Sequence, residues 1–510
     1  MFIIPALKID AVWDPIRTCV FLGTWYMASY LAQKGYEVWY SDEIIRENGL
    51  AKKRLFKRVL TGKEVSETGL DISYDDLQTH KLKDFRGLDN DSFIDKYSAF
   101  QNNTVTRIIA RIGNPEEETL TEIEKIRPDV VGIPLISSAN HIAATELAKC
   151  IKERFPQIKI VFGGQHVSAL GKEFLTDKPY IDHIVVGSGF EALKMILDGE
   201  KAPQIINGAP IPMENYPLLD PGIIFHNRYP ITPTHTYQTG GRRSVDFMFT
   251  EGCFRSCDFC FYPGCSGSNK IRYLPYDKVD KQLKNFKESG IEEIVVHDDA
   301  FLGDGKHRKD HLPKILGTMK KYGLFWQNNG GLDFELLDDE VTSIFTAYNR
   351  KGIGRITNLY IPFNPRNWNY GKSASTSMIS KHHKNLDNLK RLVDSGIYVF
   401  TSAILGTPLQ TIDNYREELE TDRELIQRGY INTAICFSAT ALFGSRWFDK
   451  YGHMIVNKED YPGYSFFPTH HRTDFFGPRE IEKLVINWLK TLDPVQKTYP
   501  WHVAFPNTSE

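Results

Sequence analysis

Residues 250–260 read Thr250-Glu251-Gly252-Cys253-Phe254-Arg255-Ser256-Cys257-Asp258-Phe259-Cys260. This run follows a segment, residues 244–250, whose composition predicts a buried strand. Its three cysteines have the spacing CxxxCxxC and lie on one short loop. Three thiolates on such a loop can hold three irons of a 4Fe-4S cluster and leave the fourth iron open to a substrate or cofactor.

Other kinds of cysteine site use part of the same pattern. Structural zinc takes four closed ligands, usually in paired CxxC units, and a redox CxxC needs only two cysteines. Cys257 and Cys260 fit either alternative, whereas Cys253 fits neither. Cys265 could complete four zinc ligands, and His297 is a remote candidate. A zinc-stabilised binding module and inert packing of the cysteines therefore remain open alternatives.

Further strand candidates follow the cysteine loop at regular distances. Most are separated by about 30 to 40 residues that include an amphipathic helix, such as residues 279–288 and 385–394. This βα rhythm predicts a partial TIM-like (β/α)6 barrel over residues 242–440. The six strand candidates are residues 244–250, 294–297, 325–328, 359–361, 398–404 and 433–438.

The first 200 residues show a similar alternation of apolar strands and amphipathic helices. It predicts a Rossmann-like parallel sheet, interrupted at about residues 43–118 by a polar insertion with helical stretches and no clear strand. Residues 201–241 are rich in proline and glycine and are interpreted as a linker. The strand candidates are residues 18–22, 37–41, 129–136, 159–162 and 183–186, and the helix candidates are residues 27–33 and 140–155.

Small or polar residues follow three of these front strands. They are Ser137-Ser138, Gly163-Gly164 and Gly187-Ser188-Gly189. In an open parallel sheet the carboxyl ends of the strands form the ligand crevice, and glycines there let a ligand approach the backbone. The alternative is that the glycines only make tight turns.

Composition narrows the class of protein. The chain has 510 residues, of which 41% are hydrophobic and 25% charged, and its net charge of -2 gives no overall basic field for nucleic acid. No apolar run approaches the ~20 residues of a membrane span, and residues 1–11 lack the charged region and cleavage site of a secretory signal. Seven cysteines argue against a disulfide framework. We therefore expect a cytoplasmic protein in which Cys19, Cys150 and Cys436 are buried packing residues.

At the cysteine loop the sequence resembles the radical S-adenosylmethionine (SAM) superfamily, including the aromatic Phe259 before the last cysteine. The resemblance implies that Cys253, Cys257 and Cys260 ligate a 4Fe-4S cluster whose open iron binds SAM. Reductive cleavage of SAM would then yield a 5'-deoxyadenosyl radical that takes hydrogen from an unactivated carbon. An electron donor such as flavodoxin or ferredoxin is implied as a partner.

Later barrel segments match that superfamily unevenly. Asp298 and Asp299 stand where relatives often have a Gly-Gly-Glu contact to the amino group of SAM, and a carboxylate could keep that role. Gly406-Thr407-Pro408 resembles the Gly-x-Pro turn of the family. Residues 360–364 depart from the Glu-Ser that relatives commonly place after the fourth strand.

The front sheet resembles the cobalamin-binding class of the same superfamily. The resemblance implies that loops carrying Ser137, Ser138, Gly163, Gly164, His166, Gly187 and Gly189 surround the nucleotide tail of cobalamin. His166 is a candidate cobalt ligand, although a second-shell role is the alternative. The familiar Asp-x-His-x-x-Gly loop is absent, because residues 22–25 read Leu-Gly-Thr-Trp.

Residues 441–510 are rich in aromatic side chains and are expected either to fill a core or to cap the barrel, with His470 and His471 as possible acid or base groups.

The resemblance favours a cobalamin-dependent C-methyltransferase acting on a small-molecule or peptide substrate. Cyclisation or rearrangement, with or without cobalamin, is the alternative within the family. We expect no nucleic-acid partner and no membrane span.

Overall fold

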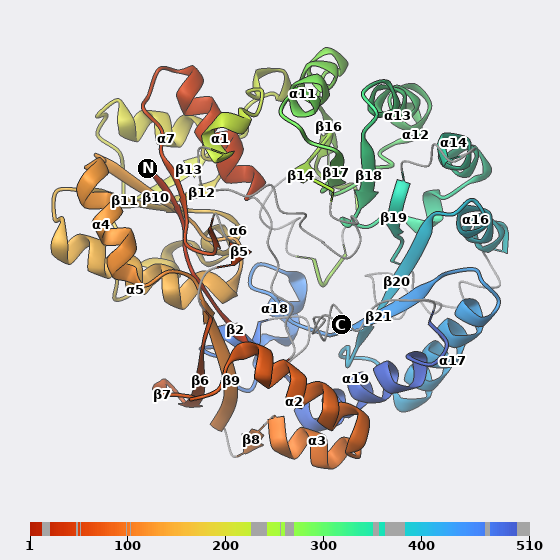
Figure 1. Cartoon of the computed structure of the whole chain (residues 1–510). Helices are drawn as coiled ribbons and strands as arrows, with labels where there is room; N and C mark the ends of the chain where they lie inside the picture. Colours follow the sequence, from red (N-terminus) through yellow and green to blue (C-terminus); the bar gives the residue numbers. More distant parts are fainter. Residues whose placement is uncertain are drawn as a thin grey trace.

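Two six-stranded parallel sheets dominate the computed structural model (Figure 1). The structure describes residues 1–12, 21–46, 49–50, 53–97, 99–101, 104–225, 242–255, 257–260, 270–349, 356–362, 383–464 and 470–496. One sheet belongs to the front part of the chain and the other follows residue 242. None of the helices in this described part is both long and apolar enough to cross a membrane.

The front sheet confirms the predicted parallel α/β arrangement. Its strand order is β13-β12-β11-β10-β1-β3, so the order reverses between β1 and β10. The helices that accompany it are α1 (Leu22–Gln33), α4 (Glu116–Ile126), α5 (His141–Arg154), α6 (Gln165–Leu170) and α7 (Phe190–Leu197). The strands are β1 (Phe2–Ile4), β3 (Tyr40–Asp42), β10 (Val130–Pro134), β11 (Lys159–Gly163), β12 (His183–Gly187) and β13 (Ile205–Gly208).

Two details of the predicted front sheet differ. The first strand is β1, made of the buried Phe2-Ile3-Ile4, and Leu22 begins α1 instead of ending a strand. Residues 18–20 of that candidate strand lie outside the described residues. β13 lies within the predicted linker, where Ile205–Gly208 pairs with β12 and extends the sheet.

The expectation of no clear strand in residues 43–118 is wrong. This insertion supplies most of an antiparallel sheet with the order β2-β9-β6-β7, in which β8 also pairs with β9. These strands lack an alternating apolar pattern: β6 buries Leu55 and Leu60, which lie on opposite faces, together with the charged Arg58, and every residue of β7 is exposed. The strands are β2 (Leu7–Asp10), β6 (Lys53–Thr61), β7 (Glu64–Gly69), β8 (Ala99–Gln101) and β9 (Thr104–Ile112). Helices α2 (Tyr74–Gly87) and α3 (Asn90–Tyr97) lie between β7 and β8 in the chain.

The second sheet confirms the predicted partial barrel. Its order β14-β17-β18-β19-β20-β21 is the chain order, with every neighbouring pair parallel. Figure 1 shows the helices α11 (Tyr276–Glu288), α13 (Leu312–Lys321), α14 (Asp339–Asn349), α16 (His383–Asp394) and α17 (Ile412–Gln427) along its outer side. The strands are β14 (Ser244–Phe247), β17 (Glu293–Val296), β18 (Phe325–Asn328), β19 (Ile356–Tyr360), β20 (Tyr398–Leu405) and β21 (Thr433–Ser438).

Alternation along these strands separates two faces. Phe247, Val296 and Trp326 share one hydrophobic core with helix residues such as Phe286, so their face is covered by helices. Residues of the opposite parity, including Asp246 and Val295, face the inside of the barrel. The barrel therefore has an apolar outer face and an inner face that carries polar side chains such as Gln327.

The C-terminal part of the chain joins the two halves of the molecule. Helix α19 (Pro478–Leu492) packs on β21 and on α3 of the insertion. Arg107 of β9 is buried between two carboxylates, with its Nη2 atom 2.6 Å from Asp460 and its Nη1 atom 3.5 Å from Asp10. Removing one partner of such a buried ionic group leaves an uncompensated charge.

Glu43 gives a test of the packing between β1 and the insertion. Its buried carboxyl accepts hydrogen bonds from Ala6 N (2.8 Å) and Thr119 Oγ1 (2.5 Å), and burial raises its pKa to about 7. A carboxyl with a raised folded-state pKa stabilises the fold most below its unfolded pKa and loses that contribution as the pH rises through the folded value.

We expect Glu43→Gln to remove this titration while the Thr119 hydroxyl turns to accept from the new amide. Between about pH 5 and pH 8, the unfolding free energy of the variant should gain about 2 kcal/mol relative to wild type. Chemical denaturation of both proteins at the two pH values measures the change. A constant difference would contradict the burial of this carboxyl.

Candidate functional site

The cysteine loop begins where the first barrel strand ends. After β14, residues Thr250–Glu251 (β15) pair with Arg272–Tyr273 (β16) in an antiparallel hairpin that brackets the loop. Gly252 has a φ of 106°, and a Cβ there would lie 2.2 Å from the Lys270 carbonyl oxygen, so only glycine fits this turn. Cys265 lies outside the described residues.

The three predicted cluster ligands follow this turn and are all half-buried. Cys260 N donates a hydrogen bond to Cys257 O at 3.1 Å, and Arg255 N donates to Cys253 Sγ at 3.4 Å. Burial, together with the nearby Cys260 and Cys253, raises the pKa of the Cys257 thiol to about 12. Thiolates gathered in this way need a bound cation, so the donor set fits an iron–sulfur cluster.

The described side chains are not arranged as a complete metal-ligand set. No group of three or more Cys, His, Asp or Glu side chains with metal-binding placement occurs among the described residues. Ligation by Cys253, Cys257 and Cys260 therefore stays a prediction. The loop supplies the right donors, and the surrounding side chains explain how the loop is held.

Asp298 and Asp299 hold the start of the loop. The fully buried Asp298 accepts from Phe249 N (2.8 Å), Thr250 N (2.9 Å) and Thr250 Oγ1 (2.8 Å). The exposed Asp299 accepts from Gly252 N at 3.0 Å. Both carboxylates thus bind the backbone that leads into Cys253, and their contact with SAM stays a prediction.

Two further contacts tie the loop to other parts of the chain. Arg255 bonds Asp333 (Nε–Oδ2 2.7 Å) and Glu335 (Nη2–Oε2 2.6 Å), which follow β18. On the other side, Trp447 N in α18 (Arg446–Tyr451) donates to Asp258 O at 2.9 Å. The rings of Trp447 and Phe259 also lie 5.8 Å apart. The C-terminal region therefore packs against the cysteine loop.

The predicted Gly406 turn lies at the carboxyl end of β20 and is clamped from three sides. Its N–H donates to Gln410 Oε1 (2.6 Å), and its carbonyl accepts from His471 Nε2 (3.0 Å). Gly406 has a φ of 73°, and a Cβ would lie 2.6 Å from the side chain of Ile481 in α19. Among the described residues, the buried Thr407 hydroxyl has no hydrogen-bond partner.

The front-sheet candidates lie at the carboxyl ends of β10, β11 and β12, and the strand order reverses beside β10. Asn140 Nδ2 donates to Pro5 O at 3.3 Å and so bridges the ends of β1 and β10. Ile136, two residues after the end of β10, is 38% exposed although it is a large apolar residue. Ser137 is exposed beside it, and Ser138 is buried. A partly open edge at a strand-order switch point is where open parallel α/β sheets bind ligands.

The glycines of this edge have backbone reasons for their identity. A Cβ on Gly164 would lie 2.6 Å from Leu135 O, and one on Gly187 would lie 2.7 Å from Gly208 O. On Gly189 it would lie 3.0 Å from the Met27 sulfur, whereas on Gly163 it would make only ordinary contacts. Close packing of neighbouring loops thus explains Gly164 and Gly187, and their contact with a cofactor stays a prediction.

Both ring nitrogens of His166 lie within hydrogen-bonding distance of other side chains. Its Nδ1 lies 3.3 Å from Ser138 Oγ and its Nε2 lies 2.9 Å from His141 Nδ1. Tyr461 stacks on His141 with ring centroids 3.9 Å apart, and Phe443 meets the His166 ring edge-on at 5.5 Å. Because both ring nitrogens are engaged, the geometry favours the second-shell alternative over direct ligation of cobalt.

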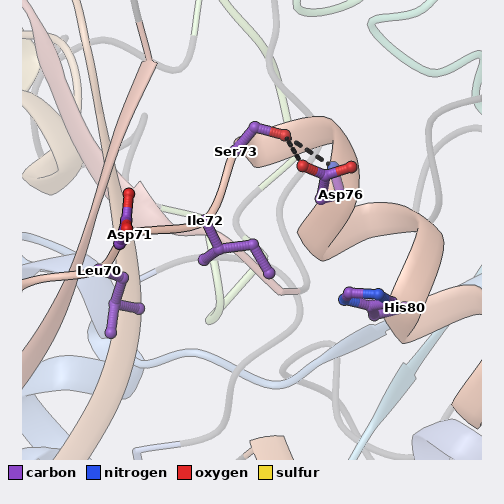
Figure 2. A pocket seen from close by; sticks show the side chains of 6 residues that line it. All are labelled: Leu70, Asp71, Ile72, Ser73, Asp76 and His80. Carbon is purple, nitrogen blue, oxygen red and sulfur yellow. Dashed lines mark hydrogen bonds between the residues drawn. The ribbon is translucent and has the colours of Figure 1, made fainter.

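A surface hollow of about 670 Å³ lies elsewhere, on the insertion where β7 leads into α2 (Figure 2). Leu70, Asp71, Ile72, Ser73, Asp76 and His80 line it. Its polar lining has a structural role, since Ser73 Oγ caps α2 by accepting from Asp76 N at 3.0 Å. None of the predicted site residues lines this hollow, and we assign it no function.

Comparison with known proteins agrees with this geometry. Residues 98–197 match the model of the B12 binding domain family. A cytidylyl-2-hydroxyethylphosphonate methyltransferase from Streptomyces wedmorensis is 22% identical over 66% of this chain and 68% of its own length. An uncharacterized methyltransferase from Pyrococcus horikoshii is 24% identical over 76% of this chain and 78% of its own length.

Solved structures show the same architecture. The radical SAM methyltransferase TsrM from Kitasatospora setae, solved with tryptophan and a SAM analogue, matches with a TM-score of 0.57 at 13% identity, over 100% of this chain and 91% of that one. Residues 98–197 of the chain thus match the B12 binding domain model, and the chain as a whole shares the fold of this methyltransferase. A second TsrM structure, with cobalamin and a [4Fe-4S] cluster bound, matches with a TM-score of 0.56 at 11% identity over the same shares of the two chains.

Sequence reasoning missed the residues that support these loops. Gln410 and the ion pairs of Arg255 carry no motif, because their partners lie 4 to 80 positions away and are brought together only by the fold. The sequence suggests His471 only as an acid or base, whereas in the structure its Nε2 bonds to the Gly406 carbonyl oxygen.

The role of Asp298 can be tested by Asp298→Asn. The new amide NH2 must face one of the backbone N–H donors, so a buried hydrogen bond is lost at a cost of about 1–3 kcal/mol. We expect a lower iron and labile-sulfide content after anaerobic reconstitution. Asp338→Asn is the matched control, because Asp338 accepts from Val341 N at 2.9 Å on the exposed start of α14. Full cluster loading of Asp298→Asn would refute the holding role.

The engagement of His166 predicts the spectrum of bound cobalamin. After loading with hydroxocobalamin and reduction to cob(II)alamin, wild type and His166→Gln should give the same nitrogen splitting of the cobalt signal in electron paramagnetic resonance. A splitting present in wild type and lost in His166→Gln would show instead that this histidine ligates cobalt.

Proposed function

We propose that this protein is a cobalamin-dependent radical SAM methyltransferase that methylates a carbon of a small biosynthetic substrate. The observation that carries the proposal is the CxxxCxxC loop at the carboxyl end of the first strand of a six-stranded parallel barrel sheet. The B12-binding domain in front of that sheet supplies the second half of the argument. Either feature alone would leave the reaction open.

When bound, the cluster supplies the electron that cleaves SAM, and cobalamin carries the methyl group. Cys253, Cys257 and Cys260 are the residues that would hold the cluster. The hydrogen bonds of Asp298, Asp299 and the Gly252 turn keep their loop at the barrel mouth. The barrel and the C-terminal region shield the reacting groups from water, which protects a radical from side reactions.

The proposal also assigns a role to each part of the chain. Residues 1–200 form the cobalamin-binding unit, with the insertion at about 43–118, and residues 242–440 form the barrel. Residues 201–241 connect them, although β13 of this stretch also extends the front sheet. Residues 441–510 cap the barrel, and contacts of Trp447 with the cysteine loop and of His471 with Gly406 support that assignment.

The substrate is a small molecule or a peptide. The named relatives act on a nucleotide-linked phosphonate in one case and were solved with tryptophan in another. An electron donor such as flavodoxin or ferredoxin would reduce the cluster. Cyclisation or rearrangement of a substrate radical is the alternative outcome of the same radical step.

Cysteine variants separate this proposal from a zinc-binding module. Cys257→Ala should abolish reductive SAM cleavage and leave an incomplete cluster, because one of three iron ligands is lost. Cys265→Ala should keep full iron, sulfide and SAM cleavage, since the cluster needs only three cysteines. Iron and labile-sulfide analysis after anaerobic purification measures both effects.

A colourless protein with one zinc and no labile sulfide would overturn the proposed function. Loss of iron in Cys265→Ala would instead overturn the choice of ligands and leave the function standing. Binding of hydroxocobalamin, followed by its visible absorption after gel filtration, tests the cobalamin half separately.

A further inference from the structure

Trp447 of the C-terminal region lies against the cysteine loop. Its backbone N–H donates a hydrogen bond to Asp258 O at 2.9 Å, and its ring meets the ring of Phe259 with centroids 5.8 Å apart. Asp258 and Phe259 are the two residues between Cys257 and Cys260. The C-terminal region thus places an indole ring on the segment that links two predicted cluster ligands.

Local contacts at the start of α18 hold Trp447 in this place. Ser445 is buried and caps the helix, since its Oγ accepts a hydrogen bond from Phe448 N at 3.1 Å. Arg446 bonds the side chain of Asp258, with 3.4 Å between Nη1 and Oδ1. Trp447 itself is 4% exposed, so the surrounding side chains enclose its ring. The indole therefore has a fixed place beside the loop.

The indole N–H of Trp447 is buried and, among the described residues, has no acceptor. An indole nitrogen can only donate, and a buried donor without an acceptor costs about 1–3 kcal/mol. Trp326 and Trp488 also lack an acceptor within the described part of the chain, so this feature alone indicates no ligand. Those two rings lie in the main hydrophobic core, whereas the ring of Trp447 contacts the cysteine loop. The missing acceptor of Trp447 therefore lies beside a predicted ligand site.

A bound 4Fe-4S cluster would supply such an acceptor. Hydrogen bonds to the sulfurs of a cluster are among the factors that set its reduction potential. The cluster gains negative charge when it is reduced, so a donated N–H stabilises the reduced form more than the oxidised form. Removal of the donor then makes reduction less favourable.

We propose that Trp447 donates its indole N–H to a sulfur of the cluster and thereby raises the reduction potential of the cluster. This inference rests on the proposed function, because it needs the cluster that Cys253, Cys257 and Cys260 would hold. The C-terminal region then does more than cover the barrel, since one of its side chains adjusts how readily the cluster accepts an electron. Trp447 makes and breaks no bond of the reaction.

The test is a redox titration of the anaerobically reconstituted enzyme without SAM, followed by the electron paramagnetic resonance signal of the reduced cluster. Trp447→Phe keeps an aromatic ring and removes the N–H. We expect wild-type iron and labile sulfide but an equilibrium constant for reduction that is about 3- to 10-fold smaller, the effect of losing one hydrogen bond to a charged group. For this one-electron couple a tenfold change corresponds to about 59 mV.

A second replacement keeps the test valid if the phenylalanine variant folds poorly. In 3-benzothienylalanine a sulfur atom takes the place of the indole N–H, so its introduction at position 447 keeps the shape of the ring and should lower the potential to the same extent. Trp488→Phe is the matched control, because it also removes a buried indole N–H, in α19, and should leave the potential unchanged.

A wild-type potential in both Trp447 variants would overturn the inference. Loss of the cluster from both variants would also overturn it, because Trp447 would then be a support of the loop. An equal shift in Trp488→Phe would overturn it as well, since the effect would not depend on contact with the loop. A wild-type protein that binds no iron and sulfide would instead overturn the proposed function.

Discussion

The arrangement of the barrel mouth depends on one buried carboxylate. Asp298 accepts three hydrogen bonds from Phe249 and Thr250, and in this way the end of the second barrel strand fixes the path of the chain that leaves the first. The turn at Gly252, the half-buried cysteines and the hairpin of β15 and β16 all follow from that path. The adjacent residue, His297, is thereby turned into the barrel and meets Asp246. His297 and Asp298, which are neighbours at the end of β17, therefore point to opposite faces of the sheet.

Periodicity predicted both parallel sheets because their strands are apolar and regularly spaced. Residues 325–328 and 433–438 match β18 and β21 at both ends, and the other barrel strands differ by at most three residues. The antiparallel insertion escaped prediction, since Lys and Arg between its buried residues resemble a polar helix as closely as a strand. The first strand was missed for a different reason. Phe2-Ile3-Ile4 is too short to show a period, and its partners β3 and β10 lie far along the chain.

The candidate site could be predicted only where chemistry is local in sequence. Three cysteines within eight residues indicate a metal site, whereas Asp246 and His297 are 51 positions apart and belong to no motif. The same limit applies to His166. As a histidine after a glycine pair it resembled a cofactor ligand, yet Ser138 and His141 take both of its nitrogens. Sequence spacing finds groups that share a loop, and the fold decides which of them face one another.

The ion pair of Arg107 has a consequence for how the molecule is made. Its guanidinium sits in the insertion sheet, but the carboxylate that holds it most closely, Asp460, is 353 residues further along the chain. A ribosome must therefore synthesise nine-tenths of the polypeptide before this closer partner is available, and until then Asp10 is the carboxylate beside the guanidinium. The ionic contacts of the insertion sheet are thus completed only after both parallel sheets have been synthesised.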